Sequence, residues 1–234
     1  AMNQGMWKDK RTQKNLSSLR ESSFHQIGPN EGDQACGDIG PGRMSEPKEI
    51  IQEVAKEFSS GLLAGKKVLI TAGPTREKID PVRYISNKSS GKMGFSLAKA
   101  AVGESAIVTL ISGPVTLETP ERVHRIDIES AEEMREKVIE NLSDIDLFIS
   151  TAAVSDFKMK NAKSQKIKKD QSKSMSLHLE KNEDILKLVS KNNPELKIVG
   201  FAAETENMID NARRKLSSKN LNLIVANDVS DSSI

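Results

Sequence analysis

After residue 65 the chain alternates short apolar runs with longer segments of helical periodicity, and this alternation constrains the fold more than any other feature. A connection long enough to hold a helix brings two strands together in parallel and packs that helix on one face of the sheet. The sequence therefore predicts a three-layer α/β unit with a mostly parallel sheet. The expected strands are residues 68–70, 106–111, 123–128, 146–151, 198–202 and 221–226, and the expected helices are 92–102, 130–142, 183–192 and 207–218.

The expected helix at residue 130 has the clearest start signal. Ser130 is followed three residues later by Glu133, which is a capping-box pattern. Apolar residues then recur at helical spacing, so we expect one buried stripe, formed by Met134, Val138 and Leu142.

The part of the chain before this alternation is organised differently. We expect a boundary that separates residues 1–60 from residues 61–234. Hydrophobic residues make up only 36% of the sequence, so part of the chain is expected to lack a core of its own. Residues 1–44 show little sustained periodicity, whereas the next segment predicts a helix that is capped by Ser45, has Pro47 in its first turn and buries Ile50, Ile51, Val54 and Phe58.

Composition narrows the function classes. A single cysteine excludes a disulfide framework and a zinc ribbon. A formal net charge of +2 implies no bulk attraction to nucleic acid or membrane, and eight aromatic residues argue against a base-stacking platform. The chain has neither a run of apolar residues long enough for a membrane span nor a readable signal peptide, so we expect a cytoplasmic protein.

Parallel α/β sheets bind ligands at the carboxyl ends of their strands. The loops to inspect are therefore those after Ile70, Ile111, Thr151, Phe201 and Ala226.

The first of these loops does not match a dinucleotide fingerprint or a P-loop. Residues 71–76 (TAGPTR) lack the spacing G-x-G-x-x-G of a dinucleotide fingerprint. Residues 89–94 (SSGKMG) are similar to the end of a P-loop, but Ser86 stands where a P-loop has its first glycine, and Met93 stands where it has serine or threonine. Two hydroxyls, two glycines and a lysine at a predicted helix N-terminus still suit a phosphate. The alternative is an ordinary helix cap with glycine in the turn.

A second signal is positive charge. Between Phe157 and Met175 there are seven lysines and one acid, Asp170, which gives a local charge of +6. Such a run is usually a solvated loop. Because it follows an expected strand, it can instead close over a polyphosphate, with Lys166, Lys168 and Lys169 as point charges.

These segments together resemble the phosphopantothenoylcysteine synthetase family, and the resemblance covers residues 65–234. It rests on ordered motifs at residues 71–76 (TAGPTR), 80–87 (DPVRYISN) with 89–94 (SSGKMG), 152–156 (AAVSD), 166–169 (KIKK), 200–205 (GFAAET) and 226–229 (ANDV). It implies a Rossmann-like sheet and a homodimer or higher homo-oligomer.

The resemblance also implies a reaction that joins 4′-phosphopantothenate to cysteine with CTP and Mg²⁺. The substrate carboxylate first attacks the α-phosphate of CTP, which gives an acyl-cytidylate and pyrophosphate. The cysteine amine then displaces CMP. Such catalysis depends mainly on positioning and charge neutralisation.

The implied site residues fall into two groups. Arg83 and Asn87 are assigned to the pantothenoyl side, and Asn87 and Lys166 are the expected catalytic residues, with Asn87 donating to the carbonyl oxygen that gains charge. The nucleotide-binding group includes Gly73. Within it, the phosphates are assigned to Ser89, Ser90, Gly91, Lys166, Lys168 and Lys169, and the sugar and base to Asp156, Phe201 and Ala202. The Mg²⁺ ligands are not identified.

Residues 1–50 resemble the end of the flavin-dependent phosphopantothenoylcysteine decarboxylase, a partial flavoprotein-type tail. Residues 1–7 (AMNQGMW) are similar to its substrate-binding motif and residues 35–44 (ACGDIGPGRM) to its active-site flap. In that family the matching Asn3 holds the substrate carboxylate and Cys36 is a catalytic acid. The alternative for Cys36 is an inert buried thiol.

The resemblances together predict an internal fragment of a bifunctional coenzyme A biosynthesis protein. The flavin-binding half with its catalytic histidine is expected to be missing before Ala1, and His25, His124 and His178 fall in none of the motifs. Some tens of residues are expected to be missing after Ile234. FMN is therefore expected only in the full-length parent, and residues 1–44 are expected to be mobile and to have few buried apolar partners.

Two other function classes stay open. The chain could be a fragment that binds nucleotide without turnover, or an interaction module whose first 44 residues form a docking arm. A preference for CTP over ATP is not readable, because base recognition by backbone amides leaves no side-chain signature.

Overall fold

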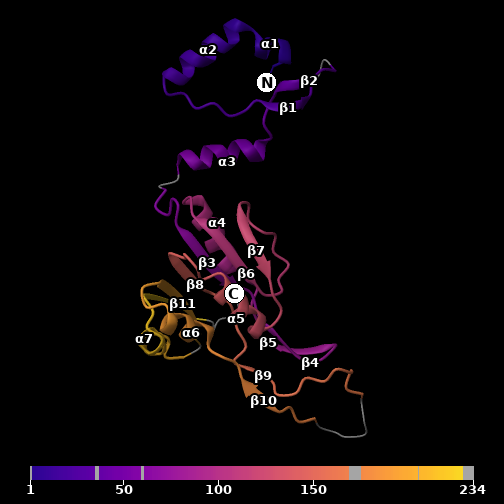
Figure 1. The fold of residues 1–234 in the computed structure, drawn as a ribbon, viewed down its shortest axis with the longest axis vertical. Helices are drawn as coiled ribbons and strands as arrows, with labels where there is room; N and C mark the ends of the chain where they lie inside the picture. Colours follow the sequence, from indigo (N-terminus) through magenta and orange to yellow (C-terminus); the bar gives the residue numbers. More distant parts are fainter. Residues whose placement is uncertain (1, 35–36, 59–60, 169–174, 205, 229–234) are drawn as a thin grey trace. The chain divides into compact units, whose positions relative to one another are not determined.

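The computed structural model describes residues 2–34, 37–58, 61–168, 175–204 and 206–228. The chain divides into two compact units, Ala1–Ser60 and Gly61–Ile234 (Figure 1). Each unit is described by itself below.

The described residues of the first unit form short helices and one antiparallel strand pair. Helix α1 (Gln4–Lys8) and helix α2 (Lys10–Glu21) come first, followed by β1 (Asn30–Asp33) paired with β2 (Ile39–Arg43), and then by α3 (Pro47–Glu57). Only α3 was expected from periodicity. The other elements carry few apolar residues, so they give no strong sequence signal.

The first unit buries no apolar side chain among its described residues. This agrees with the expectation of few buried apolar partners. The predicted buried stripe of α3 is wrong in this structure, because Ile51, Val54 and Phe58 are exposed. Helical spacing identifies an apolar face, but it does not supply a partner for that face.

The predicted cap of α3 is also wrong. Helix α3 begins at Pro47, so the residue before its first turn is Glu46 and not Ser45, whose hydroxyl donates to Asn30 Oδ1 at 3.1 Å. The backbone N–H of Glu46 donates to the Glu49 carboxylate at 2.9 Å, so an acidic side chain of the first turn binds the backbone at the start of the helix.

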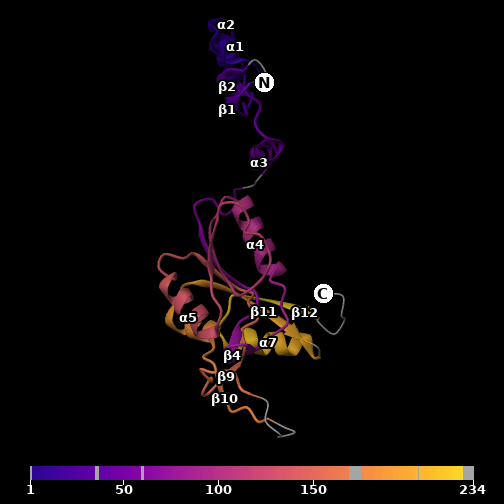
Figure 2. The same cartoon turned by 90° about the vertical axis from the view of Figure 1, so that its right-hand side faces the viewer.

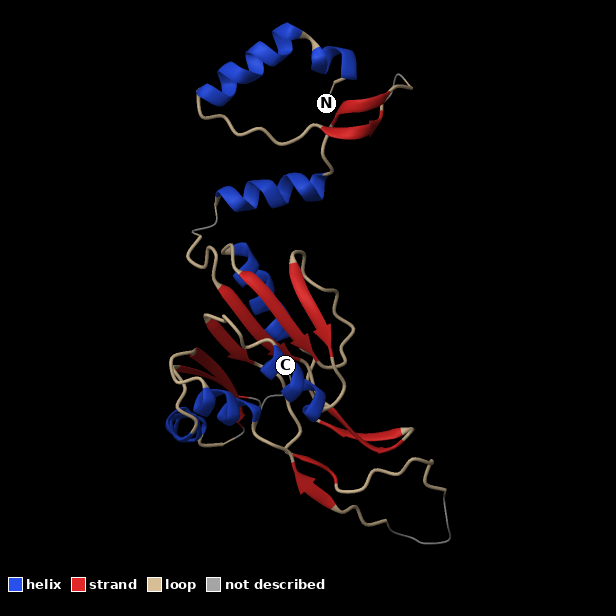
Figure 3. Cartoon of the chain, viewed as in Figure 1, coloured by secondary structure: helices blue, strands red, loops and turns tan. Residues whose placement is uncertain are grey.

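The second unit has a sheet of six parallel strands (Figure 3), which confirms the predicted fold class. Its order is β12-β11-β8-β3-β6-β7. The first three strands in the chain, β3, β6 and β7, follow one another from the centre of the sheet to one edge. The next three, β8, β11 and β12, follow one another from the centre to the other edge, which is the Rossmann order. The strands are β3 (Lys67–Ala72), β6 (Ile107–Ser112), β7 (Val123–Asp127), β8 (Leu147–Ser150), β11 (Lys197–Glu204) and β12 (Leu223–Asp228).

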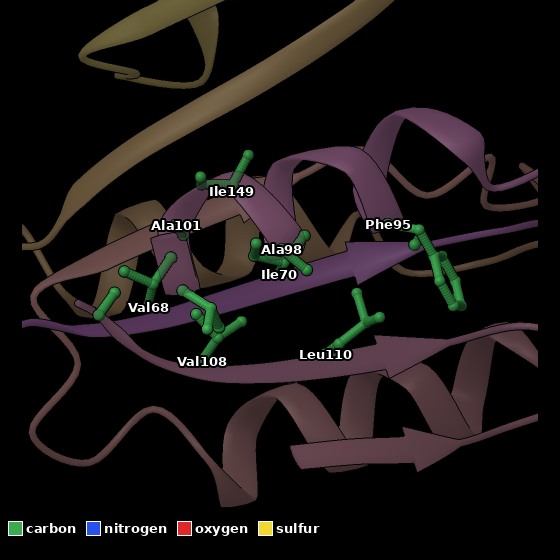
Figure 4. Packing of buried hydrophobic residues seen from close by; sticks show 11 residues of the cluster. Val68, Ile70, Phe95, Ala98, Ala101, Val108, Leu110 and Ile149 are labelled. Atoms are coloured by element: carbon green, nitrogen blue, oxygen red, sulfur yellow. The ribbon is translucent and has the colours of Figure 1, made fainter. Parts of the chain in front are cut away.

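Helices cover both faces of this sheet, and Figure 2 shows α4 and α5 on opposite sides of it. The side chains alternate along β3, so Leu69 faces one apolar cluster while Val68 and Ile70 face the other. Helix α4 (Lys92–Gly103) packs on the Ile70 face, and Figure 4 shows Phe95, Ala98 and Ala101 packed with Val68, Ile70, Val108, Leu110 and Ile149. The Leu69 cluster is completed by α5 (Ala131–Glu140) and α6 (Ile185–Asn192), with α7 (Met208–Ser218) at its margin.

Helix α5 begins as its sequence predicts. The Ser130 hydroxyl accepts from Glu133 N at 3.2 Å, and the Glu133 carboxylate accepts from Glu129 N at 2.8 Å. Met134 and Val138 are fully buried on the inner side of the helix. Local capping and tertiary packing therefore favour the same helix.

Two strand pairs interrupt the alternation, and neither was predicted. The hairpin of β4 (Arg76–Asp80) and β5 (Arg83–Ser86) follows β3, and the antiparallel pair of β9 (Phe157–Met159) and β10 (Leu179–Lys181) follows β8. Strand β4 contacts β9, so the two excursions lie side by side (Figure 1). Both extend from the carboxyl ends of neighbouring strands, where a ligand site is expected.

Candidate functional site

The strand order locates the crevice of the second unit. After β3 the chain continues to β6 on one side, whereas after β8 it continues to β11 on the other side. The two following loops therefore diverge, and Rossmann-type sheets bind ligands outside the carboxyl ends of such a strand pair. The loops are joined at their start, because Ala153 N donates to Gly73 O at 2.9 Å.

Glycines let the loops and α4 approach each other closely. Gly73 and Gly91 have φ values of +73° and +75°, a conformation that favours glycine. A Cβ on Gly91 would lie 3.0 Å from Val115 Cγ1 and 3.5 Å from the Gly73 Cα. A Cβ on Gly94 would lie 2.5 Å from Ala72 Cβ and 2.6 Å from Thr151 Oγ1. The first turn of α4 is therefore seated directly on the ends of β3 and β8.

The start of α4 combines several features that suit an anion. Gly91 is the residue before the first helical turn, and it offers no side chain as a cap. The Ser89 and Ser90 hydroxyls accept long hydrogen bonds of 3.4 Å from Gly91 N and Lys92 N. The first amides of a helix have no acceptor within the helix, and its dipole is positive at this end. Phosphate is the kind of group that such a terminus binds.

Asn87 ties the loop after β5 to the loop after β8. Its Nδ2 donates to Val154 O at 3.0 Å and to Ala153 O at 3.4 Å. Next to it, the Ser86 hydroxyl donates to Thr75 O at 2.7 Å. The amide group that was expected to donate to a substrate carbonyl thus donates to the protein backbone here, and its role toward substrate stays a prediction.

The lysine-rich segment is held by the β4–β5 hairpin. Arg83 Nη2 donates to Ile167 O at 2.7 Å, and the Asp80 carboxylate accepts from Ile167 N at 3.1 Å. Lys166 and Lys168, on either side of Ile167, are exposed. Lys169 lies outside the described residues. Arg83, expected on the pantothenoyl side, therefore uses one amino group to hold the chain between two predicted phosphate ligands.

The predicted base side lies along β11. Ala202 is buried and paired with Ala226 of β12, and Phe201 is half-buried. Asp156 is exposed in the loop after β8. Sequence reasoning missed Lys215 of α7, whose Nζ donates to Phe201 O at 2.7 Å. Burial lowers the pKa of Lys215, and the nearby charge of Lys219 adds to this effect. A single lysine on a predicted helix gave no signal for such a contact.

In the first unit, Asn3 caps a helix. Its Oδ1 accepts from Gly5 N at 2.8 Å and from Met6 N at 3.2 Å, which starts α1. This cap uses the oxygen of the Asn3 amide, and the contact of Asn3 with a substrate carboxylate stays a prediction. Cys36 lies outside the described residues, so its surroundings are not described.

The described residues contain no group of three or more histidine, cysteine, aspartate or glutamate side chains that could hold a metal ion. Within the same part of the chain, none of the helices is both long and apolar enough to cross a membrane.

Two protein-family models match the chain, one in each unit. Residues 63–234 match the family model described as the DNA/pantothenate metabolism flavoprotein C-terminal domain. The chain belongs to this family. Residues 1–59 match the model described as flavoprotein.

Curated relatives carry the name coenzyme A biosynthesis bifunctional protein CoaBC. The protein of Vibrio vulnificus is 50% identical over 98% of this chain, and that of Escherichia coli is 47% identical over the same share. The chain spans 58% of the length of each relative.

Solved structures show the same relationship. The C-terminal domain of a CoaBC protein is 46% identical, with a TM-score of 0.65 over 72% of this chain and 80% of that domain. A DNA/pantothenate metabolism flavoprotein from Streptococcus pneumoniae is 27% identical, with a TM-score of 0.63 over 71% of this chain and 83% of that one.

Proposed function

We propose that the second unit binds CTP at the carboxyl ends of β3 and β8 and joins 4′-phosphopantothenate to cysteine, as a step in coenzyme A biosynthesis. One observation carries this proposal. The close packing of Gly73, Gly91 and Gly94 brings the N-terminus of α4 to the point where the strand order diverges. The names of the CoaBC relatives, and that of a structural neighbour in complex with phosphopantothenate-cysteine, agree with this substrate class.

The triphosphate is assigned to the start of α4 and to the lysine-rich segment. Ser89, Ser90 and Gly91 supply amide and hydroxyl groups at a positive helix end. Lys166 and Lys168 supply exposed charge on a segment that is held at Ile167, and Lys169 is assigned with them. Gly73 has no side chain that would fill the space beside Gly91.

The sugar and base are assigned to the other side of the divergence point. Asp156 is an exposed carboxylate that can accept from a ribose hydroxyl, and Phe201 and Ala202 are assigned to the base. The described part of the chain has no ready-made metal cluster, so Mg²⁺ would be held chiefly by the triphosphate, with Asp156 as a carboxylate at the same edge. When bound, Mg²⁺ supplies neutralising charge to the phosphates.

The chemistry proceeds in two substitutions. The carboxylate of 4′-phosphopantothenate attacks the α-phosphorus of CTP, and the bond to the bridging oxygen breaks to release pyrophosphate. The cysteine amine then attacks the acyl carbon, loses a proton, and the bond to CMP breaks. Lys166 stabilises charge in the first step, and Asn87 stabilises the oxyanion in the second. Arg83 and Asn87 line the pantothenoyl side. We further propose a homodimer as the working form.

The first unit is proposed to be part of a phosphopantothenoylcysteine decarboxylase, with Asn3 and Cys36 as its substrate-binding and acid residues. The flavoprotein model that matches residues 1–59 supports this assignment. FMN and decarboxylation are proposed for proteins of the full length of the CoaBC relatives, of which this chain spans 58%.

The proposed ligation is tested by measuring its two products separately. With CTP, Mg²⁺ and 4′-phosphopantothenate, we expect pyrophosphate release before cysteine is added, and CMP release only after cysteine is added. Saturable CTP binding without pyrophosphate release would contradict the proposal and would favour a nucleotide-binding fragment without turnover.

A further inference from the structure

Asp80 at the end of β4 is the starting point of a further inference. The residue is only 2% exposed. Its Oδ1 accepts from Val82 N and from Arg83 N, both at 2.9 Å, and these two bonds shape the turn of the β4–β5 hairpin. The turn therefore uses only Oδ1 of the buried carboxylate.

The second oxygen reaches a distant part of the chain. Asp80 Oδ2 accepts from Ile167 N at 3.1 Å, while Arg83 Nη2 donates to Ile167 O at 2.7 Å. Arg83 Nε also lies 3.4 Å from Asp80 Oδ2. Both backbone groups of Ile167 are thus bound by charged side chains of the hairpin, and Lys163 N adds a bond of 2.9 Å to Ile79 O. Charge-assisted bonds of this kind are stronger than neutral ones.

We propose that Asp80 is a positioning residue that, with Arg83, holds Ile167 so that the neighbouring Lys166 and Lys168 are ready to bind a triphosphate. The consequence for nucleotide rests on the proposed function, whereas the hold on Ile167 does not. A segment that is already held loses less conformational entropy on binding than a free loop. Asp80 acts through the backbone and does not touch the substrate.

The ionisation of Asp80 is consistent with this role. Burial opposes the charged form, but the N–H groups of Val82, Ile167 and Arg83 and the charge of Arg83 outweigh burial and lower the pKa of Asp80 below its ordinary value. The residue is therefore a carboxylate at neutral pH, when both of its oxygens can accept.

Two variants break the same hydrogen bond from opposite sides. In Asp80→Asn the oxygen can still accept from the turn, but the NH₂ group then faces Ile167 N, which has nothing to accept with. Ile167→Pro removes the donor and leaves the hairpin intact. Asp127→Asn is the matched control, because this exposed carboxylate pairs with Arg125 and carries the same charge change.

The first measurement needs no nucleotide. In the full chain, we expect amide hydrogen exchange at Ile167, whose N–H is bound by Asp80, to become about 10- to 100-fold faster in Asp80→Asn, as loss of a charged hydrogen bond implies. Exchange at Lys163, whose N–H donates to Ile79 O in the same segment, should become faster in both Asp80→Asn and Ile167→Pro. Exchange in β3 should not change, which excludes global unfolding. Asp127→Asn should leave the segment unchanged. Unchanged exchange in both variants would overturn the hold on Ile167.

The second measurement is the affinity for CTP with Mg²⁺. Each variant is expected to weaken CTP binding about tenfold or more, and the double variant should be little worse than either single one, because both remove one interaction. Faster exchange with unchanged CTP affinity would overturn the positioning role. If the unmodified chain binds no CTP, the proposed function and the positioning role both fail, while the exchange result still decides the hold on Ile167.

Discussion

Asn87→Asp is expected to slow the attack of cysteine on the acyl-cytidylate by about 10²–10³-fold, the usual effect of losing one oxyanion donor. Formation of the acyl-cytidylate should be affected much less. The reason is electrostatic, because a carboxylate repels the carbonyl oxygen as it gains negative charge. Pyrophosphate release measures the first step, and CMP release after the addition of cysteine measures the second.

The structure supplies the control for this experiment. Asn87 also donates to Val154 O, so the Asn87→Asp substitution would loosen the loop as well as change the charge. Ser86→Ala removes the neighbouring hydroxyl bond to Thr75 O and disturbs the same region without removing the amide. Equal loss in both half-reactions of Asn87→Asp, matched by Ser86→Ala, would leave Asn87 with a loop-holding role only.

Lys166→Ala is expected to lower pyrophosphate release by at least about tenfold, because it removes a charge that would stabilise the transferring phosphates. Lys158→Ala is the matched variant. This variant also deletes one lysine charge of the same segment. The Nζ of Lys158, however, lies 3.9 Å from a carboxylate oxygen of Glu132 and from one of Glu180, so its charge already has partners within the protein. Lys158→Ala should stay within about twofold of the unmodified chain, as expected for a surface ion pair.

Similar small effects of the two substitutions would contradict the assignment. The lysine-rich segment would then be a solvated loop, which is the ordinary structure of such a charge run.

The parallel sheet could be predicted because its central strand β3 is buried on both faces. Val68, Leu69 and Ile70 are all fully buried, so the strand reads as a continuous apolar run. The β4–β5 hairpin and the β9–β10 pair gave no such signal. These strands are short and rich in charged residues, and they contain no continuous apolar run. The two pairs contact each other through β4 and β9.

Helix α3 shows the opposite limit. Its periodicity predicted the helix, but the structure leaves Ile51 and Phe58 exposed, because an apolar face in the sequence does not identify what covers it.

The candidate site divides in the same way. Motifs predicted the loops of a nucleotide site, and the strand order brings the start of α4 to the edge at which these loops lie. The binding of a ligand by these loops stays a prediction. The hold of Asp80 and Arg83 on Ile167 could not be predicted, since both side chains bind backbone groups, which every residue type except proline supplies in full. Lys215 was missed for the same reason, because its partner is the carbonyl of Phe201. The catalytic and substrate roles of Asn87, Lys166 and Arg83 stay predictions.

The central claim is that the carboxyl ends of β3 and β8 form a nucleoside triphosphate site. Calorimetric titration of the chain with CTP, ATP and UTP in the presence of Mg²⁺ tests this claim most directly. We expect saturable binding of CTP that is weakened by Lys166→Ala and unchanged by Lys158→Ala. Absence of saturable binding with all three nucleotides, or CTP binding that both variants leave unchanged, would contradict the account.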